Sequence, residues 1–333
     1  MAFSAFVTTV TQDKFIPKVT DNVLAGNVLL ERFLGNARPW GSGHKLVQPI
    51  KYTTSSAGGS YSGFDTMSTS QQNTRVNAEF DPKQSYYSVV VSGIQRAVNR
   101  GDAAVLDLLG TEMDSVAADM TDNLGTQLYA DGTGNSSKDI TGLDAAVDDG
   151  NGTATFGGLA RATYTTWVSN LDDSSNAITL AEMRASYDAA KIGNDAPTLS
   201  VTTPAIWTTI EGLLTATINY HSQVAGYPKV NRFTSRTKGT GQTGDIGFDA
   251  LYFRGCPIVS DEKCTSGRFY FLNENHLWFA RLAHPDYPTA KNGLAWTGLK
   301  EPTNQDAKVG QFLIYGNLVA DSCRTHAYMT GKS

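Results

Sequence analysis

A long polar ribbon between two strand-like segments constrains this chain more than any other feature of its sequence. Residues 53–74 read TTSSAGGSYSGFDTMSTSQQNT, and Asp65 is the only residue among them that is charged at neutral pH. The segment is too polar and too rich in glycine to bury itself, and loops of this length inside a compact domain usually carry function or lie disordered. The ribbon must therefore find its packing elsewhere, and a neighbouring copy of the chain offers such a surface. The ribbon therefore indicates a role in assembly rather than in catalysis.

Strand-like segments flank the ribbon on both sides. Residues 44–52 (HKLVQPIKY) predict a short strand, and apolar and polar residues alternate at the start of residues 75–92, as in a half-buried strand. Pro82 lacks the N–H that a strand ladder needs, so it predicts a sheet edge or a kink. We expect the two segments to pair as a long hairpin.

One long amphipathic helix follows the second segment. Asp102 is a typical N-cap, and apolar residues then recur every three or four positions until Gly132. At 1.5 Å per residue, the helix would be about 40 Å long. Gly110 and Gly125 each weaken it by roughly 1 kcal/mol relative to Ala. Their presence predicts close packing against another backbone.

The first 43 residues predict an arm with one amphipathic helical segment. Apolar side chains recur there at helical spacing, and Gly35 is a suitable C-terminal stop. Because the apolar face of an arm needs a surface to cover, Leu24, Val28 and Phe33 are candidates for contacts with a neighbouring subunit.

Residues 140–301 predict a separate α/β domain, in which strands, loops and short helices alternate. Thr179 and Glu182 form a T-x-x-E capping box at the start of one helix. Thr203-Pro204 predicts the start of another, with an N-cap followed by proline at the first helical position. Further strands are expected at 198–202, 249–260, 268–282 (turning around 273–275) and 309–320.

Charge and cysteine content exclude several classes of function. The net charge is -5 and no block of Lys or Arg occurs, so sequence-specific nucleic-acid recognition has little electrostatic support. The three cysteines form no CxxC pair and predict free thiols in a reducing compartment. The N-terminus lacks the basic start and apolar core of a signal peptide, and no run approaches the ~20 apolar residues of a membrane span. We expect a soluble protein made in the cytoplasm.

Motifs of catalysis and metal binding are weak throughout. Residues 239–244 (GTGQTG) match the dinucleotide-binding fingerprint, but they follow a polar run and precede a strand, whereas the motif needs a strand before it and a helix after it. Asp148, Asp149 and Asn151 loosely resemble a calcium loop without its glycine and closing Glu, so a turn is the better interpretation. The histidines show no metal-ligand spacing. We expect no catalytic residue, metal or cofactor, and hence no enzyme.

The order of elements resembles one known family. An N-terminal arm, an extended two-stranded loop, a long spine helix, a mixed α/β domain and a long closing strand are similar to the major capsid protein of tailed bacteriophages, with its α+β Hong Kong ninety-seven type fold. Several short sequence segments also resemble segments of this family. They are residues 156–161 (FGGLAR) with Trp167, residues 255–261 (GCPIVSD) followed by 267–273 (GRFYFLN) as an axial-domain hairpin, and residues 310–318 (GQFLIYGNL) as the final strand.

The resemblance implies a division of the chain and a role for each part. It implies an N-terminal arm at 1–43, an extended loop at 44–93 that lies over the neighbouring subunit, a peripheral domain with the spine helix at 94–139 and 302–333, and an axial domain at 140–301. Hexamers and pentamers would form an icosahedral shell around packaged double-stranded DNA. Tyr61 and Phe64, two aromatic residues within the polar loop, are the expected anchors on the neighbour; the alternative is local packing at the loop base.

The resemblance also implies partners and a location. The chain would contact other copies of itself, a separate scaffolding protein, a portal, a decoration protein in some particles, and DNA without sequence preference, but no membrane. It would be assembled in the cytoplasm of a bacterial host and end in the virion. Covalent cross-linking between subunits is not expected, since no feature places an Asn partner for Lys51 or Lys83.

Three alternatives remain open at this point. An encapsulin-like compartment shell shares the fold but encloses cargo enzymes. A secreted β-rich binding module belongs to another class, and the missing signal peptide and the long helix count against it. A nucleotide-binding enzyme depends on residues 239–244 alone.

Overall fold

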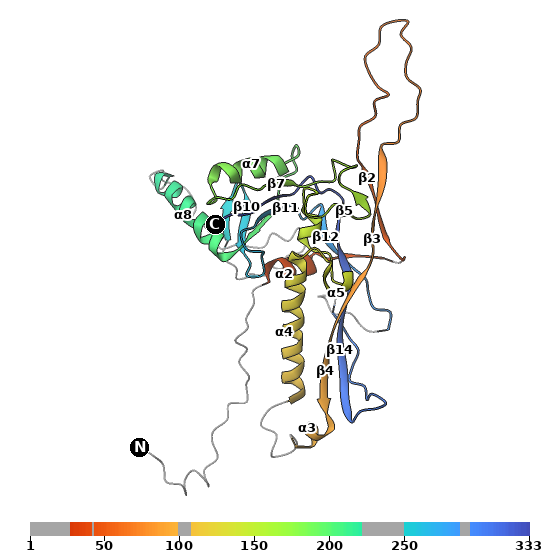
Figure 1. Ribbon diagram of the computed structural model, residues 1–333, viewed down its shortest axis with the longest axis vertical. Helices are drawn as coiled ribbons and strands as arrows, with labels where there is room; N and C mark the ends of the chain where they lie inside the picture. The colour runs from red at the N-terminus through yellow and green to blue at the C-terminus, as the bar shows by residue number, and fades with distance from the viewer. Residues whose placement is uncertain (1–26, 42, 99–107, 222–249, 287–293) are drawn as a thin grey trace, which may run out of the picture. The chain divides into compact units, whose positions relative to one another are not determined.

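The computed structural model describes residues 27–41, 43–98, 108–221, 250–286 and 294–333 (Figure 1). Contacts divide the chain into two compact units. Unit 1 draws its described residues from 86–120 and 296–313, and unit 2 draws them from 25–85, 121–295 and 314–333.

The first described helix, α2, spans Val28–Gly35 and ends at the glycine that the sequence predicted as its stop. Four apolar side chains on it are buried within unit 2, and the backbone N–H of Leu29 donates to the carboxylate of Asp261 at 3.2 Å. This bond satisfies one of the free N–H groups that every helix has at its N-terminus.

The predicted hairpin is present, but it is shorter than expected. Strand β2 (Leu46–Lys51) pairs antiparallel with β3 (Arg75–Phe80), and the register runs from Leu46 opposite Phe80 to Lys51 opposite Arg75. The strand is interrupted at Pro82, and the next strand, β4 (Lys83–Ser92), pairs with β14 instead of with β2. The expectation of one strand over 75–92 was therefore wrong, whereas the interruption that Pro82 predicted is confirmed.

The long helix is confirmed as α4 (Leu108–Tyr129), preceded by the short helix α3 (Gly93–Val98). Its predicted start at Asp102 lies outside the described residues. Gly125 faces a side chain rather than the backbone that we predicted, because a Cβ there would lie 2.5 Å from Oδ1 of Asn27. Asn27 precedes α2 and donates from its side chain to the carbonyl of Thr121 on α4 at 3.0 Å. The glycine thus makes room for a polar bond between two helices.

A six-stranded sheet forms the larger core, with strands in the order β7-β15-β11-β8-β10-β9. The strands are Asn170–Asp172 (β7), Leu199–Thr202 (β8), Ala250–Phe253 (β9), Cys256–Ser260 (β10), Phe269–Leu272 (β11) and Ala327–Met329 (β15). Since β10 and β11 both flank β8, they do not form the hairpin that the resemblance implied. β10 forms its hairpin with β9.

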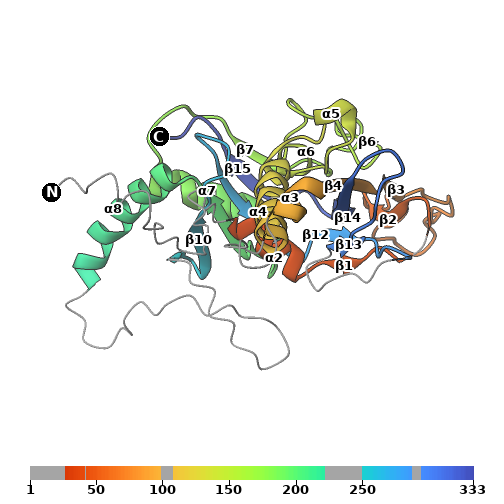
Figure 2. The ribbon, with the colours of Figure 1, turned by 90° about the horizontal axis from the view of Figure 1, so that it is seen from below.

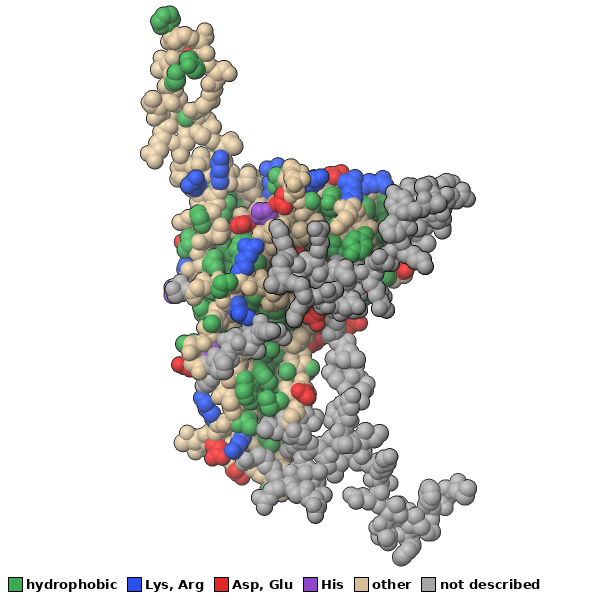
Figure 3. All heavy atoms as spheres, turned by 180° about the vertical axis from the view of Figure 1, so that it is seen from behind, with side chains coloured by type: hydrophobic (Ala, Val, Ile, Leu, Met, Phe, Trp, Pro, Cys, Tyr) green, Lys and Arg blue, Asp and Glu red, His purple; other side chains and the backbone are tan. Residues whose placement is uncertain are grey.

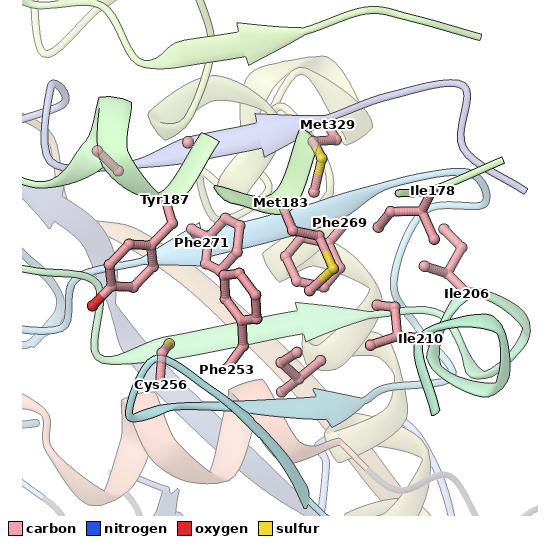
Figure 4. Close-up of a cluster of buried hydrophobic side chains, with 13 residues drawn as sticks. Ile178, Met183, Tyr187, Ile206, Ile210, Phe253, Cys256, Phe269, Phe271 and Met329 are labelled. Carbon is pink, nitrogen blue, oxygen red and sulfur yellow. The ribbon is translucent and has the colours of Figure 1, made fainter. Parts of the chain in front are cut away.

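Two helices, α7 (Leu180–Ala190) and α8 (Pro204–His221), pack on this sheet (Figures 1 and 2). The predicted capping box holds, because the Thr179 hydroxyl and the Glu182 side chain each bond the other residue's backbone N–H. Figure 4 shows side chains from both helices meeting in one buried cluster over the strands. Its labelled members are Ile178, Met183, Tyr187, Ile206, Ile210, Phe253, Cys256, Phe269, Phe271 and Met329.

The second sheet has the order β1-β12-β14-β13, with β4 also pairing β14. Its further strands are Arg38–Pro39 (β1), Leu277–Arg281 (β12), Ala295–Trp296 (β13) and Ala307–Ala320 (β14). The predicted turn around residues 273–275 is present, but it connects β11 to a strand of the other sheet. β12 therefore pairs with the closing strand, and β15, near the C-terminus, joins the six-stranded sheet. The predicted domain boundaries at 139, 140, 301 and 302 stay a prediction.

Short elements fill the segment between α4 and β7. They are α5 (Gly134–Ser137), α6 (Leu143–Ala146), β5 (Thr155–Phe156) and β6 (Leu159–Ala160). No helix within the described residues is long and apolar enough to cross a membrane.

Candidate assembly surface

The outer part of the predicted extended loop, residues 52–74, stands out from the end of the β2–β3 hairpin (Figure 1). From here on, the term extended loop refers to these residues. Tyr52 fixes its base, since its backbone N–H donates to the carbonyl of Thr74 at 3.1 Å and its hydroxyl donates to the carbonyl of Asn73 at 3.1 Å. The carbonyl of Tyr52 accepts from the hydroxyl of Thr166 at 3.2 Å, and its ring packs edge-on against Tyr164. The loop thus leaves the body of unit 2 from a defined point.

A tight turn orders the far part of the loop. The N–H of Asp65 donates to the carbonyl of Ser62 at 3.0 Å, and the N–H of Ser62 donates back to the Asp65 carboxylate at 2.8 Å. Gly63 adopts a φ of 43°, which glycine accepts at little cost. The one residue of the loop that is charged at neutral pH therefore closes the turn, and Phe64 lies within that turn.

Three large apolar side chains at and near this turn are exposed, and Figure 3 shows hydrophobic side chains along the projecting loop. The exposed fraction is 105% for Phe64, 63% for Tyr61 and 60% for Met67. Fully burying one such side chain is worth about 1.5–3 kcal/mol. Aromatic side chains that a subunit leaves in water, and that a shaped turn presents, are typical anchors of protein–protein contacts.

The other predicted contact residues lie elsewhere. Val28 and Phe33 are each only 2% exposed and pack inside their own subunit, so they have little surface left to offer a neighbour. Leu24 lies outside the described residues. Of the five predicted contact residues, Tyr61 and Phe64 have the exposure that such a role needs. Sequence reasoning missed Met67, although it occupies the same polar loop.

A second exposed apolar row occurs in unit 1, and the sequence analysis did not single it out. Tyr86 and Val90 lie on one face of β4, opposite the buried Val89 and Val91. The helix α3 continues the row with Ile94 and Val98, one helical turn apart and both exposed. Tyr86 and Val90 are four residues apart in the strand, and Ile94 and Val98 are four apart in the helix. Because this spacing returns to the same face in either element, it was the available signal.

Groups that could carry chemistry are buried or engaged elsewhere. All three cysteines are free and buried, and burial raises the pKa of Cys256 and Cys323 to about 12, which leaves these thiols protonated and unreactive. The Asp148 carboxylate accepts from the backbone N–H groups of Gly150 at 2.7 Å and Thr153 at 3.0 Å, so this segment is the turn that we predicted.

The remaining motifs offer no site within the described residues. No cluster of three or more His, Cys, Asp or Glu side chains in that part of the chain could hold a metal ion. Residues 239–244, which match the dinucleotide fingerprint, lie outside it. The geometry of the described residues thus offers an assembly surface, whose chemistry is burial of apolar area.

Comparisons with known proteins place this geometry among capsid structures. No protein-family profile and no curated protein sequence matches the chain. The chain superposes on a subunit of the cyanophage A-1(L) capsid with a TM-score of 0.73 and 15% identity, over 99% of both chains. It matches the capsid of Myoviridae phage XM1 at a TM-score of 0.60 and 11% identity, over 99% of both chains.

An encapsulin gives a similar match. The holo-encapsulin complex from Synechococcus elongatus aligns at a TM-score of 0.60 and 12% identity, over 100% of this chain and 97% of the other. At such low identities the matches establish the fold alone. The predicted α+β fold of the Hong Kong ninety-seven type is confirmed.

Proposed function

We propose that this chain, which has the fold of tailed-phage capsid subunits, is a major capsid protein. It assembles into hexamers and pentamers and forms an icosahedral shell around double-stranded DNA. The end-to-end match with the cyanophage capsid subunit carries this proposal, because 99% of each chain is covered. The same match supports a structural role, and the proposal includes no catalysis.

The extended loop supplies the contact that the proposal needs. In the assembled shell it lies over the neighbouring subunit, where Tyr61 and Phe64 enter apolar surface and Met67 fills the space beside them. Each contact need contribute only a few kcal/mol, because every subunit makes several contacts at once and avidity multiplies them. The polar remainder of the loop keeps an isolated subunit soluble.

Further partners follow from the same proposal. The N-terminal arm, including Leu24, reaches around adjacent subunits. A separate scaffolding protein guides assembly, a portal occupies one vertex, and a decoration protein binds the outer face in some particles. The net charge of -5 suits a lining that holds DNA without gripping it, since many cationic contacts would arrest its movement. Assembly takes place in the bacterial host, and the finished chain belongs to the virion.

An encapsulin-like compartment is the second candidate, because an encapsulin also matches the whole chain. It ranks below the first because its TM-score is 0.60 against 0.73 for the cyanophage capsid. The contents of purified particles separate the two: packaged DNA favours the capsid, and enclosed protein favours the compartment. A secreted binding module has no support from these full-length matches.

Electron microscopy and light scattering on the purified full-length chain test the proposal. Closed shells, or rings of five and six subunits, are expected either for the chain alone or with a co-expressed scaffolding protein. A protein that stays monomeric at high concentration under both conditions contradicts it.

The double variant Tyr61→Ser/Phe64→Ser tests the loop anchors. Because both side chains are exposed in the subunit, its melting temperature should stay unchanged, whereas assembly should require at least roughly tenfold more protein. Light scattering against protein concentration measures this shift. Ser60→Ala, in the same loop, is the matched control and should assemble like the parent. Equal assembly of the double variant and the parent would rule out the two anchors.

A further inference from the structure

One histidine ties together three segments of unit 2. His276 lies in the turn between β11 and β12, with Nδ1 2.6 Å from Oδ1 of Asp321 and Nε2 2.5 Å from Oδ2 of Asp195. Asp321 directly follows β14, and Asp195 lies between α7 and β8. We call these three residues the His276 clamp.

Both hydrogen bonds of the His276 clamp can form at once only when the imidazole is protonated. A neutral imidazole has one N–H and can donate to only one carboxylate, whereas the imidazolium donates to both. Partial burial disfavours the charge, but the hydrogen bonds and attraction to Asp321 and Asp195 outweigh it and raise the pKa of His276 above its ordinary value of 6.5. The two carboxylates lie on opposite ring nitrogens, so they do not converge on a point where a metal ion could bind.

The charged neighbours leave this arrangement intact. Glu274, in the same turn, is paired with Arg32 of α2 at 2.5 Å. His326 is fully buried and accepts at Nδ1 from the N–H of Asn273 at 3.1 Å. Burial, and the nearby His276, lower the pKa of His326 to about 3, so it is neutral and adds no competing charge.

The clamp lines the hollow from which the extended loop departs. This open hollow has a volume of about 700 Å³, and residues 48–54, the end of β2 and the start of the loop, form part of its wall. His276 and Asp321 line it together with Trp167 and the cations Lys51 and Arg324. The hydroxyl of Thr166, also in the lining, holds the carbonyl of Tyr52. The clamp and the support of the loop therefore border the same hollow.

We propose that the His276 clamp is a pH-sensitive joint, which holds the support of the extended loop rigid while the imidazole is protonated and loosens it when the proton leaves. After deprotonation, one carboxylate faces a ring lone pair and loses its hydrogen bond to His276. Asp321 keeps the bond from its backbone N–H to the carbonyl of His276 at 3.1 Å, and Asp195 keeps the bond from the Asn273 side chain at 2.8 Å, so the joint loosens without opening. The consequence for a shell, a loop that reorients more freely above neutral pH, rests on the proposed function; the titration of the joint itself does not.

The sign of the pH dependence follows from the direction of the shift. His276 binds its proton more tightly in the folded chain than in the unfolded chain. The clamp's contribution to stability is therefore fully present below about pH 6.5. It is lost as pH rises through the raised pKa of the folded state.

Histidine-specific deuterium exchange at the imidazole carbon, read by mass spectrometry, measures the pKa of each histidine in the full-length chain. His276 should titrate above 6.5 and His326 far below it. In Asp321→Asn the pKa of His276 should move down from its value in the parent chain. A His276 pKa at or below the ordinary histidine value of 6.5 in the parent chain overturns the proposal.

Backbone hydrogen exchange tests the mechanical consequence. Between pH 6 and 9, peptides that contain Asp195, His276 or Asp321 should lose roughly tenfold in protection after correction for intrinsic rates, as expected for one lost charge-assisted hydrogen bond. His276→Gln, which does not titrate, should abolish this pH dependence, and His44→Gln should retain it. If the parent shows constant protection, or if His276→Gln shows the same pH dependence as the parent, the joint is not pH-sensitive. Both measurements are made on subunits, so they can fail while the chain still assembles.

Discussion

Replacing Arg161 by Ala should lower the free energy of unfolding by about 3–5 kcal/mol, the usual cost of removing one partner from a buried charged network. Arg161 is 1% exposed, and its guanidinium donates to four backbone carbonyls and lies 3.5 Å from the Asp148 carboxylate. The acceptors are the carbonyls of Ala145, Ala146, Thr153 and Trp167, at 2.7–3.2 Å. Alanine leaves all of them, and a nearly buried carboxylate, without this donor.

The loss should extend to the base of the β2–β3 hairpin. Arg161 follows β6 and braces the segment in which the Trp167 indole donates to the carbonyl of Phe156 at 3.0 Å and the two rings stack. Phe156 in turn packs edge-on against Phe80 of β3. The same arginine therefore supports the base of the β2–β3 hairpin, the end away from the loop, where Phe80 lies opposite Leu46.

Chemical denaturation of subunits measures the effect. Arg161→Lys keeps the charge but cannot reproduce the planar fork of donors, so it should recover only part of the loss. Arg184→Ala, at an exposed position on α7, is the matched control and should change stability by less than about 0.5 kcal/mol. A cost below about 1 kcal/mol for Arg161→Ala would mean that the network is not formed in solution.

Gly142→Ala should cost about 3 kcal/mol or more, at the upper end for forcing atoms into a packed region. A Cβ on Gly142 would lie 2.4 Å from the carbonyl oxygens of Gln127 and Ala130 and 2.6 Å from that of Leu128. These are backbone atoms at the end of α4, so no side-chain rotation can relieve the overlap. The chain would have to separate α6 from the C-terminal end of α4.

Gly212→Ala is the matched control with the opposite sign. A Cβ at Gly212, inside α8, would meet nothing within 4 Å, and alanine is the better helix former by roughly 1 kcal/mol. The same substitution should therefore raise the melting temperature at residue 212 and lower it at residue 142. Thermal unfolding of both variants under one condition checks the pair. A stable Gly142→Ala would contradict the close approach of α6 to α4.

The features that the sequence predicted well are those with local causes. The polar loop could not bury itself, Pro82 could not donate to a ladder, and Gly35 ended α2, because each depends on the chemistry of a few neighbouring residues. The same holds for the capping box of α7, which is complete within four residues. Exposure of Tyr61 and Phe64 followed from the polarity of the residues around them.

Only the tertiary structure decided which apolar faces meet and which strands pair. Periodicity predicts that Leu29 and Phe33 lie on one helix face, but it does not predict that their own subunit covers them. Any strand edge can pair with any other. The sequence pattern therefore could not predict that β8 lies between β10 and β11, or that β12 belongs to the other sheet. In the His276 clamp, His276 is 81 positions from Asp195 and 45 positions from Asp321. Arg161 binds backbone carbonyls, and because every residue has one, the sequence does not show which carbonyls it will bind. The sequence by itself thus determined the local breaks, the caps and the exposure of the loop's aromatic side chains. Packing alone determined their partners, because free energy is gained by burial against whichever surface the folded chain brings near.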